Sequence, residues 1–139
     1  MAVVSAGTCA TVEQTEGVRT LFEAVGRALV VPEDVQDAAT AISGSGPAYV
    51  ALIADALADA GEAQGLTREV ALALAVQTFR GTADLLDSSG MEPQALIDAV
   101  SSPGGTTVAA LGVFDARGLR ALVSDAVDAA VRRAKELGS

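Results

Sequence analysis

Seven consecutive apolar residues, Val70–Val76, constrain this chain more than any other feature. They lie inside a pattern that predicts a long helix, with Thr67 as its N-cap and an end near Asp87. Because seven residues cover roughly two helical turns, such a helix is apolar on every side and must be covered on every side. We expect a second copy of the chain to supply that cover through a two-fold dimer. A fully internal helix within one copy is the alternative.

The first 31 residues differ in pattern from the rest. Met1–Ser5 and Ala28–Val31 are short, β-branched runs, and Val12–Val25 has helical spacing. A strand, a helix and a strand cannot form a stable sheet alone, so we expect this segment to be the end of an α/β domain whose beginning is absent. The alternative is a small hairpin at the edge of a helical body.

From Pro32 to the end, every segment has a helical pattern. The residues predict helices over about 32–42, 47–64, 67–87, 93–100, 107–114 and from Leu119 onward. The fold class is therefore mainly α: residues 32–139 form a helical bundle in an intertwined dimer, and a residual β-α-β piece precedes it. The last helix has the cleanest amphipathic stripe.

Composition excludes several functions. The formal net charge is −9 and the isoelectric point is about 4.2, which argues against binding to nucleic acid or to an anionic membrane surface. The chain has no histidine, and its single cysteine is Cys9. We therefore expect no metal site, no internal disulfide and no histidine-based triad. Hydroxyls, carboxylates, backbone dipoles or a cofactor must do any chemistry.

The sequence predicts a cytoplasmic protein. The residues after Met1 lack both the basic start and the long apolar core of an export signal. The longest apolar helical pattern is interrupted by Asp55 and Asp59, short of the roughly 20 residues that a membrane span needs. We expect no membrane-spanning segment.

The run Ser101–Thr107, SSPGGTT, interrupts two helical patterns with an unusual turn. Its two glycines permit a backbone that other residues adopt only at a cost, and the threonines stand where a helix begins. Free N–H groups at a helix start, with hydroxyls of Ser102, Thr106 and Thr107, would suit a carboxylate or a phosphate. An ordinary tight loop with an N-cap is the alternative.

A second segment of this kind is Ser43–Tyr49, SGSGPAY. It lacks the third glycine and the preceding strand of a dinucleotide-binding loop, so that fingerprint fails. We expect a Gly/Ser/Pro turn here that opens a helix near Pro47, as the turn at Ser101–Thr107 opens another.

Taken together, SGSGPAY (43–49), DALADAG (55–61) and SPGGTT (102–107) resemble the C-terminal domain of pyrroline-5-carboxylate reductases in order and in spacing. The resemblance covers essentially the whole chain. It implies reduction of the C=N bond of 1-pyrroline-5-carboxylate by NADPH or NADH, which gives L-proline in the last step of its synthesis. It also implies an N-terminal Rossmann domain, of which residues 1–31 would be the last part, without the glycine-rich cofactor loop.

The resemblance assigns roles to particular residues. It places the substrate carboxylate against Ser102, Gly104, Gly105, Thr106 and Thr107, in agreement with the anion-site interpretation of this turn. It places Thr40 near the substrate ring and the nicotinamide, with a hydrogen bond to the imine nitrogen; a helix-interior threonine that bonds its own backbone is the alternative. Some relatives have a glutamate near the position of Ser89, and this sequence departs from them.

Three interpretations remain open on the sequence. The first is the reductase, whose active site would lie between the nucleotide domain of one subunit and the helical domain of the other. In the second, the chain is a dimerisation module without catalysis of its own, because it has no loop to hold a hydride donor. The third, a helical domain of another dehydrogenase family, is disfavoured by the Gly-Gly-Thr-Thr turn. Assembly beyond a dimer is left open.

Overall fold

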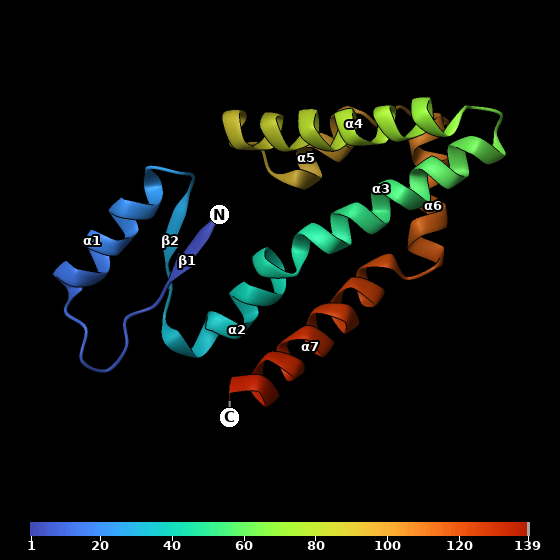
Figure 1. Cartoon of the computed structure of the whole chain (residues 1–139). Coiled ribbons are helices and arrows are strands. Elements are labelled where there is room, and N and C mark those ends of the chain that lie inside the picture. Colours follow the sequence, from blue (N-terminus) through green and yellow to red (C-terminus); the bar gives the residue numbers. More distant parts are fainter. Residues whose placement is uncertain (139) are drawn as a thin grey trace. The chain divides into compact units, whose positions relative to one another are not determined.

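The computed structural model describes residues 1–138 and divides into two compact units. One unit combines residues 1–48 with the chain from Val123 onward, and the other comprises residues 49–122. Most of the chain is helical, and its two strands lie near the N-terminus (Figure 1). The predicted fold class, mainly α with a short β-α-β piece, is confirmed.

The β-α-β piece consists of β1 (Ala2–Val4), α1 (Val12–Glu23) and β2 (Ala28–Val30). The strands are parallel and in register from Ala2 opposite Ala28 to Val4 opposite Val30. This parallel pairing shows that the hairpin alternative is wrong, since a hairpin joins antiparallel strands. A capping box fixes the start of α1: Gln14 N–H donates to the Thr11 hydroxyl, and Thr11 N–H donates to the Gln14 side chain.

The helix expected over 32–42 is divided into three kinds of turn. A 3₁₀ segment η1 (Glu33–Val35) leads into α2 (Gln36–Ala39) and then into a π-helical segment η2 (Thr40–Gly44). In η2 the Ser45 N–H donates to the Thr40 carbonyl at 3.0 Å, a spacing of five residues.

The helix expected from near Pro47 is confirmed as α3 (Gly46–Ala63). The turn expected before it is wrong, because helical backbone continues from η2 into α3. Pro47 lacks an N–H and would clash with the carbonyl one α-helical turn earlier. The wider π turn gives the physical reason that a proline is accommodated here without breaking the helix. The glycines and serines that suggested a turn are instead part of this widened helix.

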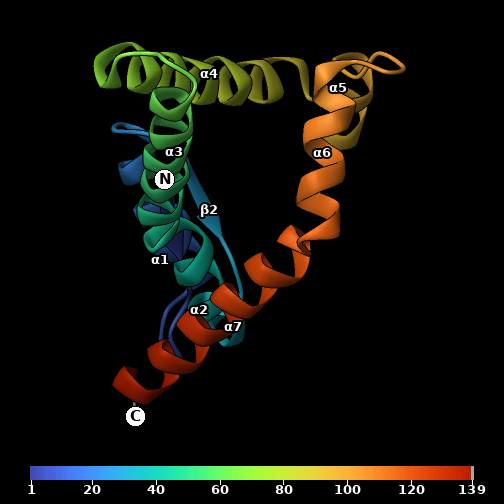
Figure 2. The same ribbon diagram turned by 90° about the vertical axis from the view of Figure 1, so that its right-hand side faces the viewer.

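Helices α3 and α4 (Arg68–Ser89) are joined by a short loop (Figure 2). A β-carbon on Gly61 would lie 2.8 Å from the β-carbon of Ala71, so the two helices approach closely where only glycine fits. The predicted N-cap is confirmed, since the Val70 N–H donates to the Thr67 hydroxyl at 3.3 Å.

Arg68 links the same two helices by charge. Its guanidinium forms ion pairs with Asp55, Asp59 and Glu62, which follow one face of α3. Desolvation alone would lower the pKa of Arg68, but hydrogen bonds and charges of Asp59 and Asp55 outweigh it and hold the pKa above its ordinary value.

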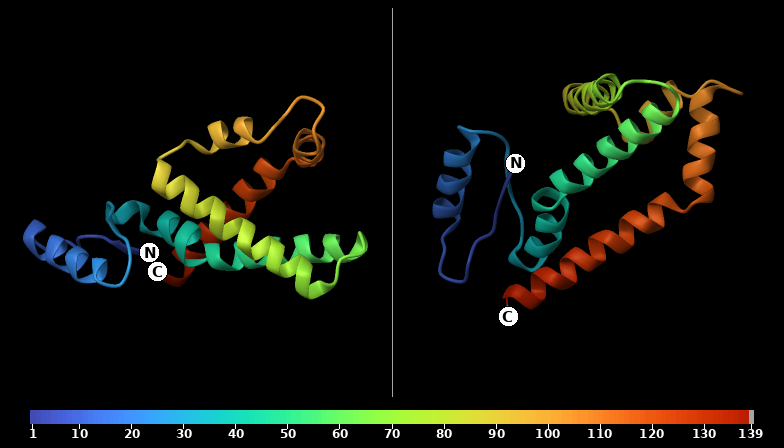
Figure 3. Two further views of the ribbon diagram at one scale, coloured as in Figure 1. Left: turned by 90° about the horizontal axis from the view of Figure 1, so that it is seen from above. Right: turned by 45° about the vertical axis from the view of Figure 1, so that its right-hand side comes forward.

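The remaining helices are α5 (Pro93–Ala99), α6 (Thr106–Ala116) and α7 (Leu119–Gly138). A glycine in the left-handed conformation follows each of two helices. Gly90 follows α4 with φ of 64°, and Gly118 follows α6 with φ of 68°. Helix α6 is longer than expected at both ends. The loop that joins α5 to α6 can be followed in Figure 3.

Among residues 1–138 the buried hydrophobic side chains are all alanines: Ala28, Ala41, Ala54, Ala58, Ala71 and Ala75. Within the apolar run of α4, the large side chains remain exposed, from 39% at Leu72 to 56% at Leu74. In the part of the chain that the structure describes, α4 is therefore not an internal helix. The valines and leucines of its apolar run are exposed in these residues.

One helical segment, residues 33–63, is long and apolar enough to cross a membrane by length and composition, with a mean hydropathy of 1.3. The sequence prediction missed this, because it began the helix near Pro47 instead of joining it to the residues before. Core helices of soluble proteins meet the same criteria, so this finding does not identify a span.

Candidate functional site

The predicted site loop contains a tight turn at Ser102–Gly105. The Gly105 N–H donates to the Ser102 carbonyl at 2.9 Å and closes the turn. Pro103 takes the second position and Gly104 the third, with φ of 72°. A proline followed by a left-handed glycine is the signature of a type II turn, which explains the order Pro-Gly in the sequence.

Gly105 is required for a different reason, since its φ of −76° is ordinary. A β-carbon there would lie 2.5 Å from the Ser102 hydroxyl oxygen and 2.9 Å from the Ser102 carbonyl oxygen. Ser102 therefore folds closely over the N-cap residue of α6, and any side chain at Gly105 would push the turn open.

Helix α6 starts without a cap. Its N-cap residue is Gly105, and no side chain accepts a hydrogen bond from the first turn. The first N–H with a partner is that of Ala109, which donates to the Gly105 carbonyl at 3.2 Å. The N–H groups of Thr106, Thr107 and Val108 are unpaired, as expected for a helix start that lacks a cap. The ordinary capped loop is therefore wrong.

The hydroxyls around this helix start are also free. Within residues 1–138, the side chains of Ser102, Thr106 and Thr107 form no hydrogen bond. The loop thus combines three N–H donors, the positive end of a helix dipole and three hydroxyls. Such a group of donors can bind a carboxylate, which presents acceptor oxygens only.

One serine of this loop was not among the predicted site residues. The hydroxyl oxygen of Ser101 is buried and has no hydrogen-bond partner. The adjacent pair Ser101-Ser102 was visible in the sequence, but nothing in the pattern indicated which of the two hydroxyls is buried. The N–H of Val108 was missed in the same way, because the helix was expected to begin one residue later.

Thr40 is the first residue of the π-helical segment and is exposed. Its hydroxyl forms no hydrogen bond in the described residues, whereas Ser43 donates to the Ala39 carbonyl at 2.9 Å. The alternative in which Thr40 bonds its own backbone is thus wrong. A β-carbon on Gly44 would lie 3.3 Å from the Thr40 methyl carbon, so Gly44 leaves room for this side chain.

The predicted residues fall in both units. Ser102, Gly104, Gly105, Thr106 and Thr107 belong to the unit of residues 49–122, and the loop brings them together. Thr40 belongs to the other unit.

The Ser89 hydroxyl forms hydrogen bonds to the backbone at the C-terminal end of α4. Its hydroxyl donates to the Leu85 carbonyl at 2.6 Å and accepts from the Met91 N–H at 3.1 Å. Both bonds are to the backbone, so the Ser89 side chain closes the C-terminal end of α4.

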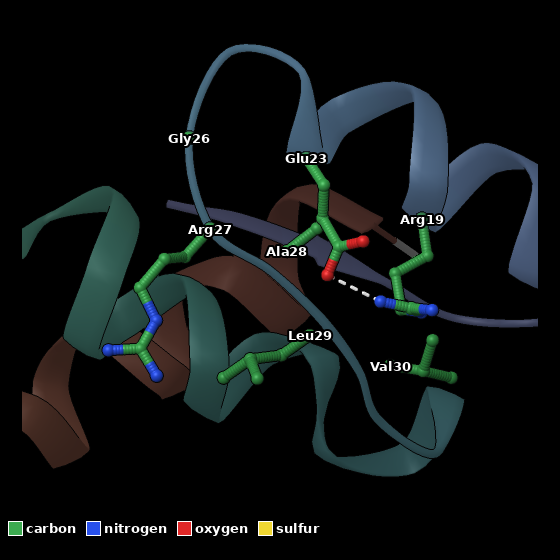
Figure 4. Close-up of a pocket in the computed structure, with 7 residues that line it drawn as sticks. All are labelled: Arg19, Glu23, Gly26, Arg27, Ala28, Leu29 and Val30. Carbon is green, nitrogen blue, oxygen red and sulfur yellow. Dashed lines mark hydrogen bonds and ion pairs between the residues drawn. The ribbon is translucent and has the colours of Figure 1, made fainter.

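A cavity of about 550 Å³ lies beside the end of α1 and strand β2, and none of the residues that line it is a predicted site residue (Figure 4). Arg19 lines it and is held by Glu16 at 2.7 Å and by Glu23. The hydrogen bond and charge of Glu16, then the charge of Glu23, raise the pKa of Arg19.

Among residues 1–138 no group of three or more histidine, cysteine or acidic side chains could hold a metal ion.

Known proteins match this chain over most of its length. A family model described as pyrroline-5-carboxylate reductase dimerisation matches residues 33–137. The pyrroline-5-carboxylate reductase of Synechocystis is 45% identical over 99% of this chain and 52% of its own length. That of Arabidopsis thaliana is 48% identical over 97% of this chain and 49% of its own length.

Solved structures agree with these matches. A pyrroline-5-carboxylate reductase from Coxiella burnetii has a TM-score of 0.92 and 40% identity, covering 97% of this chain and 50% of that one. The Plasmodium falciparum enzyme, solved with NADP bound, has a TM-score of 0.88 and 34% identity, covering 99% of this chain and 52% of that one. The chain thus spans about half the length of the relatives that it matches.

Proposed function

Because this chain belongs to the pyrroline-5-carboxylate reductase family, we propose that it is the dimerising, substrate-holding half of an enzyme that reduces 1-pyrroline-5-carboxylate to L-proline. The observation that carries this proposal is the uncapped start of α6, where three N–H groups and the hydroxyls of Ser102, Thr106 and Thr107 are free. A five-membered cyclic imine with one carboxylate is a small anion that these donors suit.

The role of the loop is to fix one end of the substrate. With the carboxylate held at Thr106 and Thr107, the ring extends away from the helix and presents its C=N bond at a set distance. A protonated imine already has an electrophilic carbon, so orientation contributes more than a strong acid would. NADPH or NADH, when bound, supplies the hydride.

Thr40 is proposed to contact the imine nitrogen. Its hydroxyl is exposed and unpaired, and the π turn together with Gly44 gives its side chain room. π-helical turns recur at functional sites, which supports the proposal. A hydroxyl that can donate and accept is suited to a nitrogen whose protonation changes during reduction.

Residues 1–31 are proposed to be the end of a Rossmann domain that binds the cofactor. Two parallel strands with one crossover helix are too few for a stable sheet, and the relatives are about twice as long as this chain. The cofactor would be held mainly by the other half of such a protein, and the active site would combine one subunit's nucleotide domain with the other's helical domain.

The dimer is proposed to form through α4, whose apolar run stays exposed in this chain. A second copy with the same surface would cover these side chains and bury them as a domain core does.

We further propose that the protein works in the cytoplasm, without nucleic acid or membrane partners, as its net charge of −9 favours.

The test is NADPH oxidation with 1-pyrroline-5-carboxylate, first with this chain alone. It is then repeated with a chimera that carries the nucleotide-binding half of the Synechocystis relative ahead of residue 1. Activity in the chimera alone is expected. A folded, dimeric chimera without activity would overturn the proposal and leave a dimerisation module as the function of this chain.

A further inference from the structure

Ser101 has an unusual hydroxyl. It is the single side-chain nitrogen or oxygen among residues 1–138 that is buried and has no hydrogen-bond partner. Native proteins leave few such groups, because a buried polar atom without a partner destabilises the folded state. The free hydroxyls of Ser102 and Thr106 differ from it, since both residues are exposed and water can satisfy them.

The position of Ser101 connects it to the carboxylate loop. It follows Val100, the C-cap of α5, and its N–H donates to the Asp98 carbonyl at 3.3 Å. The next residue, Ser102, begins the tight turn and folds closely over Gly105. Ser101 therefore lies between the end of α5 and the turn that leads to the N–H groups of α6.

We propose that Ser101 is a positioning residue of the carboxylate site, whose hydroxyl gains its hydrogen bond when the loop closes on the bound substrate. This inference rests on the proposed function of the loop. A ligand shifts a conformational equilibrium only through a difference in its interactions with the two states. An unpaired hydroxyl in the free loop that becomes paired in the loaded loop provides such a difference.

Ser101→Ala should weaken substrate binding without lowering the stability of the free protein. In the free protein the substitution removes an unpaired buried oxygen, so the melting temperature should stay equal or rise. In the active chimera the loaded state loses one hydrogen bond, so KM for 1-pyrroline-5-carboxylate should rise by about three- to tenfold. KM for NADPH and kcat should not change.

The experiment compares Ser101→Ala, Ser101→Thr and Thr107→Ala in the chimera, with Ser88→Ala as a matched control on the exposed end of α4. Ser101→Thr keeps the hydroxyl and should restore KM for the substrate. An unchanged KM in Ser101→Ala with a raised KM in Thr107→Ala would overturn the role of Ser101 alone. Unchanged values in both would also contradict the carboxylate site. A lower melting temperature with unchanged KM would show that the hydroxyl is structural.

Discussion

Two segments of this chain have nearly the same composition and fold in different ways. SGSGPAY (43–49) and SPGGTT (102–107) both combine serine, two glycines and one proline. The first continues a helix through a π turn, and the second forms a tight turn that opens a new helix. Their difference is the order of residues: Pro103 precedes its glycines and starts a turn, whereas Pro47 follows its glycines and lies inside a helix.

The order also decides which polar groups remain free. After Pro103, the left-handed Gly104 turns the chain so that α6 begins with three unpaired N–H groups. Before Pro47, the π turn keeps the backbone bonded and leaves the side chain of Thr40 unpaired. One segment therefore offers backbone donors to a ligand, and the other offers a hydroxyl.

The largest effect is expected from Gly105→Ala in the active chimera. Its methyl group would meet the Ser102 hydroxyl at 2.5 Å and force the turn to move. A displacement of this size should lower kcat/KM by on the order of a hundredfold. The matched control is Gly112→Ala in the same helix, where nothing lies within 4 Å of the added carbon. Equal kinetics for the two variants would show that the turn does not hold the substrate.

Thr107→Ala should raise KM for 1-pyrroline-5-carboxylate by about tenfold, because one hydroxyl that bonds a charged group is lost. KM for NADPH should change little. Steady-state kinetics with each substrate varied in turn separates the two values. An equal rise in both would contradict a role in holding the carboxylate.

Thr40→Val tests the π turn. Valine keeps the shape of the side chain and loses the hydroxyl, so kcat should fall a few-fold if Thr40 contacts the imine nitrogen. Gly44→Ala is the companion variant, since its methyl would lie 3.3 Å from the Thr40 methyl and displace the side chain slightly. Normal kcat in Thr40→Val would restrict the site to the SPGGTT loop.

The smallest effect should come from Arg68→Gln, which touches neither segment. Losing the ion pairs to Asp55, Asp59 and Glu62 should lower the melting temperature slightly, and added salt should shrink the difference. A pKa above the ordinary value means that this contribution is complete at lower pH and disappears only as pH rises through that pKa. Melting across the neutral and mildly alkaline range should therefore show a constant difference between the variant and the parent.

Sequence periodicity predicted the elements whose signals are local. Thr67 capped α4 as expected, and the β-branched runs at both sides of α1 became parallel strands. The π turn could not be predicted, because its glycines and proline also fit an ordinary turn, and only the hydrogen bonds distinguish the two. At the site, the residue types of the loop indicated an anion, but the missing cap and the buried Ser101 hydroxyl depend on how the chain folds back on itself.

The all-alanine interior has a consequence for how the protein would behave in dilute solution. A methyl group contributes little transfer free energy, so the buried alanines of residues 1–138 give little apolar stabilisation, and a surface that covered Leu72, Leu74 and their neighbours would add to it. If that surface belongs to a second copy, stability follows mass action. The melting temperature would then fall with dilution, and each copy would be folded only for as long as it has a partner.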